Sequence, residues 1–343
     1  MNTEERVEVV LPGKVEPEAL ELHRGPVPVP GAGQVVIRME ATGVSFAEQQ
    51  MRRGRYYDQP PFPFVPGYDV VGTVQAVGTG VGSELVGTRV AALTKVGGWA
   101  SHVLLEAADV IEVPEGISAP EAETAVINGI TAWQMLYRKA HVRSGQTILV
   151  HGANGGVGTI LVQLARAAGI RVIGTASARH HEALRAAGVT PIDYRTEDVP
   201  SRVRELAPDG VDAVFDHLGG RSVIDSWHLL ARGGTLVSYG TATTRDDEGW
   251  KQWPVLKIVF RLLLWNALPN GRHAYFFNVW SGKARGAEAF RARLREDLTQ
   301  VFTALRRGEI TPTIAAQLPL AQAAEAMRLA ESSTVSGKIV LVP

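Results

Sequence analysis

Apolar residues are arranged differently in the first third of the chain and in its middle. Before about residue 115 they form short alternating runs, at residues 35–39, 70–77 and 100–105, with glycine and proline dense between them. Alternation with a period of two predicts half-buried strands that are joined by turns. This part of the chain is therefore expected to form small antiparallel β structure.

From about residue 147 the apolar runs become continuous, and a helical pattern follows most of them. Strands are predicted at residues 147–151, 171–175, 211–216 and 235–239, and helices at 159–168, 180–187 and 222–231. Continuous apolar strands that alternate with helices are typical of a parallel sheet covered on both faces. The middle of the chain is thus predicted to be a doubly wound α/β domain.

Towards the C-terminus the helical pattern dominates. Apolar positions spaced by three and four predict a long helix over residues 287–307, followed by a helix near 321–331 and a strand over 339–342. The parallel-sheet segment therefore lies between two segments that together must complete the other domain.

Two further apolar segments lie between the last predicted parallel strand, at 235–239, and the long helix at 287–307. Residues 253–268 predict an amphipathic helix, because Lys257 and Arg261 interrupt a run that is too short to span a bilayer. Such a helix packs over a cleft or a subunit interface, or it lies on a membrane surface. Residues 275–280 predict a strand at the uncovered edge of the parallel sheet, which suggests pairing with a second copy in a homodimer.

A glycine-rich turn between the first predicted parallel strand and its helix is the strongest motif. Its sequence over residues 151–158 is HGANGGVG, which spaces three glycines as G-x-x-G-x-x-G. In dinucleotide-binding folds such glycines allow a tight turn, the approach of a pyrophosphate and close packing of the helix, whose N-terminus attracts phosphate. The residues expected to contact the cofactor here are Gly152, Asn154, Gly155, Gly156, Val157 and Gly158.

The end of the next strand predicts which dinucleotide is bound. An acidic residue about 20 positions after the glycines would bind a ribose 2′-hydroxyl. The sequence after Thr175 instead continues with Ala176 and Ser177, and the first acidic residue after Thr175 is Glu182. Ser177 and Arg179 suit a 2′-phosphate, because arginine offers paired donors and a permanent charge. NADPH is therefore expected rather than NADH.

Composition narrows the classes of function. Lys plus Arg equals Asp plus Glu, at 35 each, so no net field favours nucleic acid or an anionic membrane, and a small-molecule partner is expected. The absence of cysteine excludes disulfides, thiolate zinc sites and a nucleophilic thiol. The N-terminus is acidic where a signal peptide is basic, which together with the lack of a membrane-length apolar run predicts a cytoplasmic protein.

From about Val7 to its end, the chain resembles the quinone oxidoreductase branch of the medium-chain dehydrogenase/reductase superfamily. The resemblance rests on the glycine turn and on the segments ATGVS at 41–45, RGRY at 53–56, PFVPGYDVVG at 63–72, NGITAW at 128–133, Asp193-Tyr194 and GKIVL at 337–341.

This resemblance implies a GroES-like, partly open β-barrel catalytic domain over 1–126 and 288–343, and a six-stranded Rossmann domain over 127–287. It also implies a cofactor cleft between the two domains and a homodimer. The implied cofactor contacts outside the glycine turn are Thr131, Ser177, Arg179, Tyr194, Tyr239, Gly240 and Lys338.

The chain departs from its relatives at several positions. Ser45 stands where many of them carry asparagine, His180 stands where lysine is common, and the segment 245–286 is longer than in the simplest members. Zinc-dependent relatives place cysteine near Ser45 and histidine at Tyr68. Serine and tyrosine are poor zinc ligands, so no metal site is expected.

The histidines add no metal site, because His180 and His181 would point apart on a helix, while His141, His217 and His228 fit surface or loop positions. Without a Lewis acid, hydride transfer from NADPH to a quinone or an enone is the expected reaction, since hydrogen bonds alone can hold the resulting oxyanion.

Tyr56 is the candidate donor to that oxyanion, with packing against nearby prolines as the alternative. Ser45 is a candidate for orienting nicotinamide or substrate, or it satisfies backbone, and Asp69 is expected to be structural. Two other functions stay open. One is a tailoring reductase of secondary metabolism for an enoyl or imine intermediate, which is suggested because the excess of arginine over lysine and the many alanines fit a GC-rich bacterial genome. The other is a low-turnover NADPH-binding redox sensor.

Overall fold

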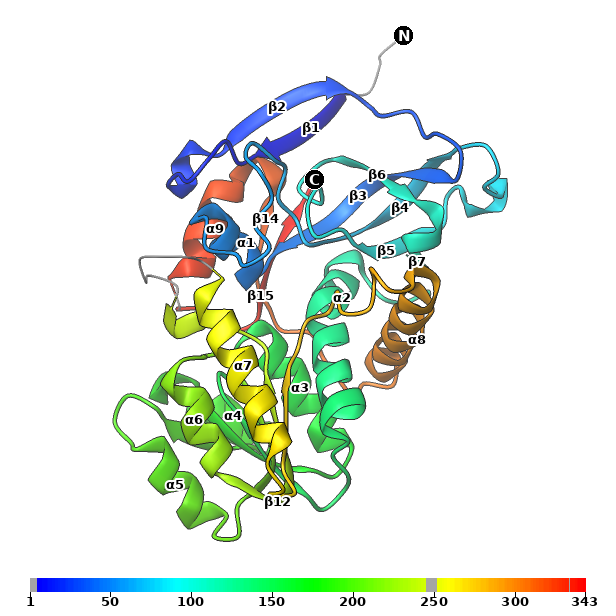
Figure 1. Ribbon diagram of the computed structural model, residues 1–343. Coiled ribbons are helices and arrows are strands. Elements are labelled where there is room, and N and C mark those ends of the chain that lie inside the picture. The colour runs from blue at the N-terminus through cyan, green and yellow to red at the C-terminus, as the bar shows by residue number, and fades with distance from the viewer. Residues whose placement is uncertain (1–4, 245–251, 333) are drawn as a thin grey trace. The chain divides into compact units, whose positions relative to one another are not determined.

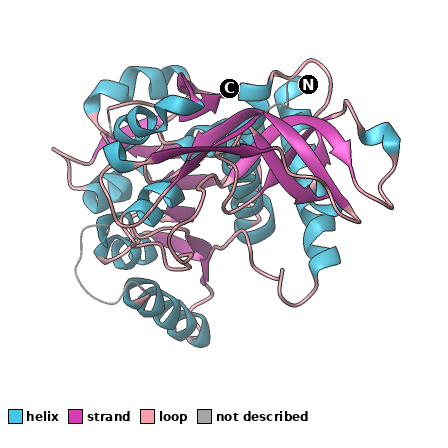
Figure 2. Ribbon diagram, turned by 90° about the horizontal axis from the view of Figure 1, so that it is seen from above, coloured by secondary structure: helices cyan, strands magenta, loops and turns pink. Residues whose placement is uncertain are grey.

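The computed structural model describes residues 5–244, 252–332 and 334–343 (Figures 1 and 2). The chain divides into two compact units. The first comprises Met1–Gly129, Ala287–Arg306 and Pro312–Pro343, and the second comprises Ile130–Gly286 and Arg307–Thr311. The first seven residues of the longer segment 245–286 lie outside the described residues.

The second unit is built on a six-stranded parallel sheet with the order β10-β9-β8-β11-β12-β13. Its strands are β8 (Thr147–Val150), β9 (Arg171–Ala176), β10 (Thr190–Asp193), β11 (Val211–Asp216), β12 (Leu230–Ser238) and β13 (His273–Phe276). The chain builds outwards from β8 to β10, returns to the other side of β8 and builds outwards again from β11 to β13. This arrangement confirms the predicted doubly wound domain.

Helices connect these parallel strands. They are α3 (Gly156–Ala167), α4 (His181–Ala186), α5 (Val199–Leu206), α6 (Arg221–His228) and α7 (Trp253–Ala267). Right-handed crossovers place α3 and α4 on one face of the sheet and α6 and α7 on the other. Trp227 of α6 stacks on Trp265 of α7 at 4.6 Å between ring centroids, and α7 also buries Ile258 and Leu262. The predicted helix is thus confirmed, and its exposed side carries large apolar residues such as Phe260 and Leu263 as well as polar ones.

The edge strand β13 differs from its prediction in two ways. It ends at Phe276, because the Asn278 side chain accepts a hydrogen bond from Trp280 N at 2.9 Å and so starts a turn. Its edge is also covered at one residue, since the Asn266 amide accepts from Ala274 N at 2.8 Å and donates to Ala274 O at 2.7 Å. α7 therefore satisfies the backbone of Ala274, and pairing of a second copy with residues 275–280 stays a prediction.

The first unit contains a seven-stranded mixed sheet and a two-stranded sheet. The strands are β1 (Glu5–Val10), β2 (Glu21–Pro26), β3 (Gln34–Val44), β4 (Asp69–Val77), β5 (Arg89–Leu93), β6 (His102–Glu106), β7 (Ile111–Glu112), β14 (Ile314–Pro319) and β15 (Lys338–Val342). Pairs within β1–β7 are antiparallel, as expected. β14 and β15 are parallel because a helix connects them.

That helix is α9 (Ala323–Glu331), and the unit also contains α1 (Phe46–Arg52), α8 (Ala287–Arg306) and the first part of α2 (Ala119–Trp133), which continues as a π-helix over Gln134–Ala140. The predicted long helix over 287–307 is confirmed. Arg52 forms a two-pronged ion pair with Glu331, at 2.9 and 2.7 Å, and thereby holds α1 on α9. No helix in the described part of the chain is long and apolar enough to cross a membrane.

Candidate functional site

The glycine turn in the second unit has the backbone geometry that a close approach requires. Gly152 adopts a left-handed conformation with φ +65°, which allows the chain to turn directly after β8. A Cβ atom at Gly158 would lie 2.2 Å from Gly152 O, so only glycine lets α3 begin this close to the turn. The turn is held on β9 by Thr175, whose Oγ1 and O accept from Gly152 N at 3.1 Å and Ala153 N at 3.0 Å.

This geometry fits the pyrophosphate of a dinucleotide. Gly155 precedes the first turn of α3, and Thr159 N bonds to Gly155 O at 2.9 Å, so the N–H groups of Gly156, Val157 and Gly158 begin the helix without intrahelical acceptors. Helix N-termini of this kind bind phosphate through backbone N–H groups and the helix dipole. Asn154 lies in the same turn.

A buried hydrogen-bond chain supports the turn from below. Ser226 Oγ donates to Asp216 Oδ2 at 2.9 Å and therefore accepts from His151 Nε2 at 3.2 Å, which leaves His151 Nδ1 to accept from Thr175 Oγ1 at 3.4 Å. Burial lowers the pKa of His151, so the ring is neutral. The chain thus links the turn after β8 to the end of β11.

The strand register brings the candidates for the adenosine 2′-phosphate together. Asp193 pairs with Ala176, so Tyr194 and Ser177 directly follow neighbouring strand ends. Ser177 is buried, whereas Arg179 and Tyr194 are exposed, and Arg179 Nε donates to His180 Nε2 at 3.1 Å. A carboxylate is absent from the end of β9 in this described segment, so the edge carries hydroxyl and guanidinium donors, which fit a phosphate rather than a ribose hydroxyl.

The ends of β11 and β12 complete this edge of the sheet. Tyr239 N donates to Asp216 O at 2.8 Å, and a Cβ atom at Gly240 would lie 2.6 Å from His217 O. His217 is the residue that the sequence interpretation missed. It lies in a loop, as expected, but its ring packs on Gly152, and its only sequence signal was a histidine between Asp216 and a glycine pair.

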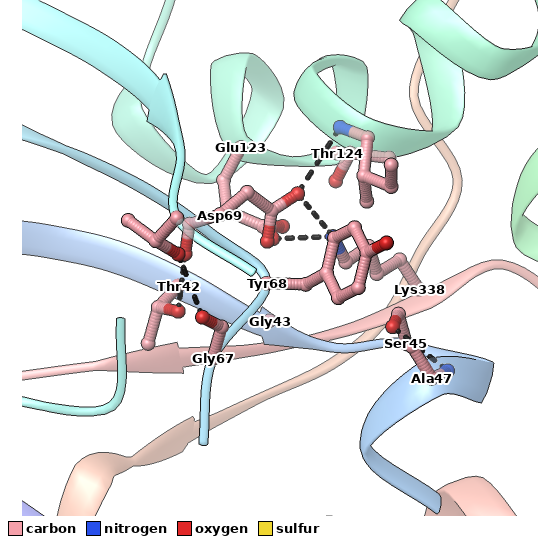
Figure 3. Close-up of polar contacts among 12 residues, drawn as sticks. Thr42, Gly43, Ser45, Ala47, Gly67, Tyr68, Asp69, Glu123, Thr124 and Lys338 are labelled. Carbon is pink, nitrogen blue, oxygen red and sulfur yellow. Dashed lines mark hydrogen bonds and ion pairs between the residues drawn. The ribbon is translucent and has the colours of Figure 1, made fainter. Parts of the chain in front are cut away.

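A cluster of buried charges lies in the first unit (Figure 3). Lys338 Nζ, at the start of β15, lies 2.9 Å from Asp69 Oδ2 and 2.5 Å from Glu123 Oε1, and the three side chains are at most 2% exposed. A Cβ atom at Gly43 would lie 2.2 Å from Glu123 Oε1, so the glycine makes room for the ion pair. Asp69 Oδ2 also accepts from Ile127 N at 3.1 Å, which confirms the expected structural role of Asp69.

The cluster shifts the ionisation of its members in opposite directions. Burial raises the pKa of Glu123 well above its usual value, and the attraction of Lys338 only partly offsets this effect. Burial lowers the pKa of Lys338, but attraction to Asp69 and Glu123 outweighs it and leaves the pKa raised. Lys338 is therefore a permanent cation between two carboxyl groups. A contact between Lys338 and a cofactor stays a prediction.

Ser45 acts locally as a helix cap. Its Oγ accepts from Ala47 N at 3.1 Å and donates to Glu48, whose Oε2 accepts from Ser45 N at 2.8 Å. Glu48 Oε1 accepts from Tyr68 N at 2.7 Å, so this carboxyl group ties the start of α1 to the residue that directly precedes β4. Burial raises the pKa of Glu48.

Tyr56 and Tyr68 form a hydroxyl pair in the first unit, with 2.8 Å between the two oxygens. Tyr56 is 7% exposed, and its ring lies 4.8 Å from that of Tyr57. Burial, together with Tyr68 and Tyr57, raises the pKa of Tyr56 strongly. The phenol therefore keeps its proton and is suited to donating a hydrogen bond rather than to releasing a proton.

Ser45 and Tyr68 stand where zinc-dependent relatives carry zinc ligands, but their contacts do not fit a zinc ion. Ser45 is committed to the cap of α1, and Tyr68 is paired with the buried, protonated Tyr56. Within residues 5–244, 252–332 and 334–343, no group of three or more His, Asp or Glu side chains is arranged to hold a metal.

Thr131, an expected cofactor contact, lies in α2 and is buried.

Two protein families match the chain. The alcohol dehydrogenase GroES-like domain matches residues 31–115, and the zinc-binding dehydrogenase family matches residues 188–341. Among characterised proteins, the synaptic vesicle membrane protein VAT-1 homolog of Rattus norvegicus is 35% identical over 328 residues, which cover 92% of this chain and 78% of that protein.

Solved structures match almost the whole length of the chain. A mycobacterial protein in complex with NADPH has a TM-score of 0.83 and 30% identity, and the match covers 98% of this chain and 100% of that one. A quinone oxidoreductase of Pseudomonas syringae has a TM-score of 0.84 and 27% identity, with 98% and 100% of the two chains covered.

Proposed function

Because the chain belongs to the quinone oxidoreductase branch of the medium-chain dehydrogenase/reductase superfamily, we propose that it uses NADPH to reduce a quinone or an α,β-unsaturated carbonyl compound. Its units are the GroES-like and Rossmann domains of that superfamily. The main support for the proposal is the glycine turn, where the left-handed Gly152 and the missing side chain at Gly158 let α3 begin close to β8 and leave its first N–H groups for a pyrophosphate.

NADPH rather than NADH is the proposed cofactor. The end of β9 presents Ser177 and Arg179 and no carboxylate, Tyr194 follows the neighbouring end of β10, and the Asp193 carboxylate there accepts from Arg195 N at 3.0 Å. One or two charge-assisted hydrogen bonds correspond to at least ~10-fold tighter binding of NADPH. A related mycobacterial structure contains NADPH, which supports this choice.

Zinc independence is part of the proposal. The chain has no cysteine, and Ser45 and Tyr68 take part in a helix cap and a hydroxyl pair instead of presenting ligands. An acceptor whose reduced form is a stabilised enolate or phenolate suits such a site, because hydrogen-bond donors can hold the developing oxyanion.

When bound, NADPH supplies a hydride from its nicotinamide ring. The chain's own contribution is to bind the cofactor at the glycine turn and to place a neutral donor at the acceptor oxygen. Tyr56 is the proposed donor, since its phenol stays protonated and its hydroxyl lies 2.8 Å from that of Tyr68. Ser45, which caps α1, is proposed to orient the substrate or nicotinamide through the position of that helix.

Steady-state oxidation of NADPH tests this function. The acceptors are 9,10-phenanthrenequinone, 1,4-benzoquinone and an enone, each measured with and without a chelator, alongside elemental analysis of the protein. We expect turnover with at least one acceptor class, no loss with chelator and no stoichiometric zinc. Tight NADPH binding with no turnover would favour the redox sensor, and turnover that requires about one zinc per chain would contradict the metal-free proposal.

A homodimer is also proposed, and α7 offers a candidate surface in addition to the predicted edge at residues 275–280. Asn266 covers the β13 edge at Ala274, whereas α7 exposes the large apolar side chains of Leu256, Phe260 and Leu263. An exposed apolar face of this kind would be buried by contact with a second copy. Light scattering at micromolar concentration should give the mass of a dimer, and a monomer would count against the proposal.

A further inference from the structure

His217 stands at the point where the strand order of the parallel sheet reverses. It directly follows β11, and Gly152 lies in the turn after β8, the neighbouring strand in the sheet. β8 and β11 are adjacent in space, but the chain visits β9 and β10 between them. In doubly wound sheets, ligands bind at the carboxyl ends of the two strands that flank such a reversal.

The imidazole of His217 lies against the glycine turn, next to the ring of Tyr239. A Cβ atom at Gly152 would lie 2.5 Å from His217 Cε1, so the ring rests directly on the first glycine of the turn. The ring centroid of Tyr239, after β12, lies 5.9 Å away. Asp216 holds the following loop by accepting from Leu218 N at 2.8 Å and Gly219 N at 3.0 Å.

His217 and its neighbour His151 differ in the hydrogen bonds that their ring nitrogens make. Both nitrogens of His151 have partners, Ser226 and Thr175. By contrast, Nδ1 of His217 is buried and has no hydrogen-bond partner among the described residues. Burial lowers the pKa of His217 to about 4, so the ring is neutral at physiological pH and keeps one lone pair and one N–H. A buried polar atom without a partner is costly, and a bound ligand group would supply one.

The order of the strands indicates which part of a dinucleotide lies there. The adenosine end is assigned to Ser177 and Tyr194, after β9 and β10, and the pyrophosphate to the turn after β8. The cofactor then continues past β8 in the same direction, and the next strand is β11. The nicotinamide side of the molecule is therefore the part that reaches His217.

We propose that Nδ1 of His217 hydrogen-bonds a ribose hydroxyl on the nicotinamide side of NADPH, which makes His217 a positioning residue for the hydride donor. This inference rests on the proposed NADPH binding. A hydroxyl both donates and accepts, so it matches Nδ1 in either tautomer.

The test compares three variants by fluorescence titration and calorimetry. His217→Leu removes the nitrogen, His217→Asn keeps a polar atom near the position of Nδ1, and His228→Leu removes an exposed histidine of α6 as the matched control. Each protein is titrated with NADPH and with 2′,5′-ADP, which carries only the adenosine half and the 2′-phosphate.

We expect His217→Leu to weaken NADPH about 3- to 10-fold, the loss of one neutral hydrogen bond, with 2′,5′-ADP unchanged. His217→Asn should recover most of that loss, and the control should match the unmodified protein. Unchanged NADPH affinity in His217→Leu, or equal weakening of both ligands, would overturn the proposal. If the leucine variant does not fold, failure of His217→Asn to bind NADPH normally would overturn it. If the unmodified protein binds 2′,5′-ADP but not NADPH, the inference fails, and if it binds neither, the proposed function itself fails.

Discussion

Replacing Lys338 by methionine is the sharpest test of the buried charge cluster. Lys338 is the cation between Asp69 and Glu123, at 2.9 and 2.5 Å, and all three side chains are almost fully buried. Methionine fills a similar volume but leaves two buried carboxyl groups without a counter-charge. Breaking a buried pair in this way costs roughly 3–5 kcal/mol. At about 2–4 °C per kcal/mol for a domain of this size, the transition should fall by at least ~6 °C.

Differential scanning calorimetry measures the effect, with Arg328→Gln as the control. Arg328 pairs with Glu18 at 2.8 Å, but both side chains are more than half exposed, so its loss should change stability by less than about 1 kcal/mol. The double variant Lys338→Met with Glu123→Gln should recover part of the loss, because one carboxyl group is then neutral.

The pH dependence gives an independent check. Without Lys338 the burial of Glu123 keeps its pKa above the unfolded value, so this carboxyl group favours folding when protonated and loses that contribution as pH rises. The variant should thus be less impaired at about pH 5.5 than at about pH 8. A Lys338→Met protein as stable as the Arg328→Gln control at both values would refute this account of the cluster.

Further predictions concern the cofactor, the donor and the turn. Arg179→Ala should weaken NADPH about tenfold or more and leave NADH unchanged in fluorescence titrations, because only NADPH carries the 2′-phosphate. Tyr56→Phe should lower kcat ~10²-fold with an enone and less with a quinone at unchanged NADPH affinity, whereas unchanged kcat on both would leave Tyr56 a packing residue. Gly158→Ala, whose Cβ would meet Gly152 O at 2.2 Å, should cost about 1–3 kcal/mol in thermal unfolding and abolish NADPH binding. His217 is neutral in the folded protein, so its contribution to stability is present above its unfolded pKa of ~6.5 and is lost as pH falls towards 4. In an acid titration of stability, His217→Asn should therefore show a smaller loss between these pH values.

The parts of the fold that the sequence predicted are those set by local backbone rules. The turn after β8 needed left-handed geometry at Gly152 and no side chain at Gly158, and both requirements are visible as a glycine spacing. The helix over 287–307 was predicted by a spacing of three and four residues, and the structure ends it at Arg306. Such signals lie within one segment and need no knowledge of partners.

The features that the sequence did not predict depend on contacts between distant segments. Lys338, Asp69 and Glu123 meet only because β15, β4 and α2 converge, although an acid within an apolar helix and a lysine before an apolar strand were available as signals. The cover of the β13 edge depends on one amide, Asn266, reaching back from α7. Tyr56 was identified as a candidate, but its hydroxyl partner Tyr68 was considered only as a replaced zinc ligand.

Hydride transfer itself is the central claim, and an isotope label tests it most directly. The protein is supplied with an enone and with NADPH that carries deuterium on one face or the other of nicotinamide C4, and the product is analysed by mass spectrometry and NMR. Hydride addition at the carbon β to the carbonyl, with a solvent proton taken up at the α carbon, yields NADP⁺ and the saturated ketone. We expect one of the two labelled cofactors to give product with a single deuterium at the β carbon and the other to give none. Oxidation of NADPH without deuterium in the product from either isomer would contradict the proposed reaction.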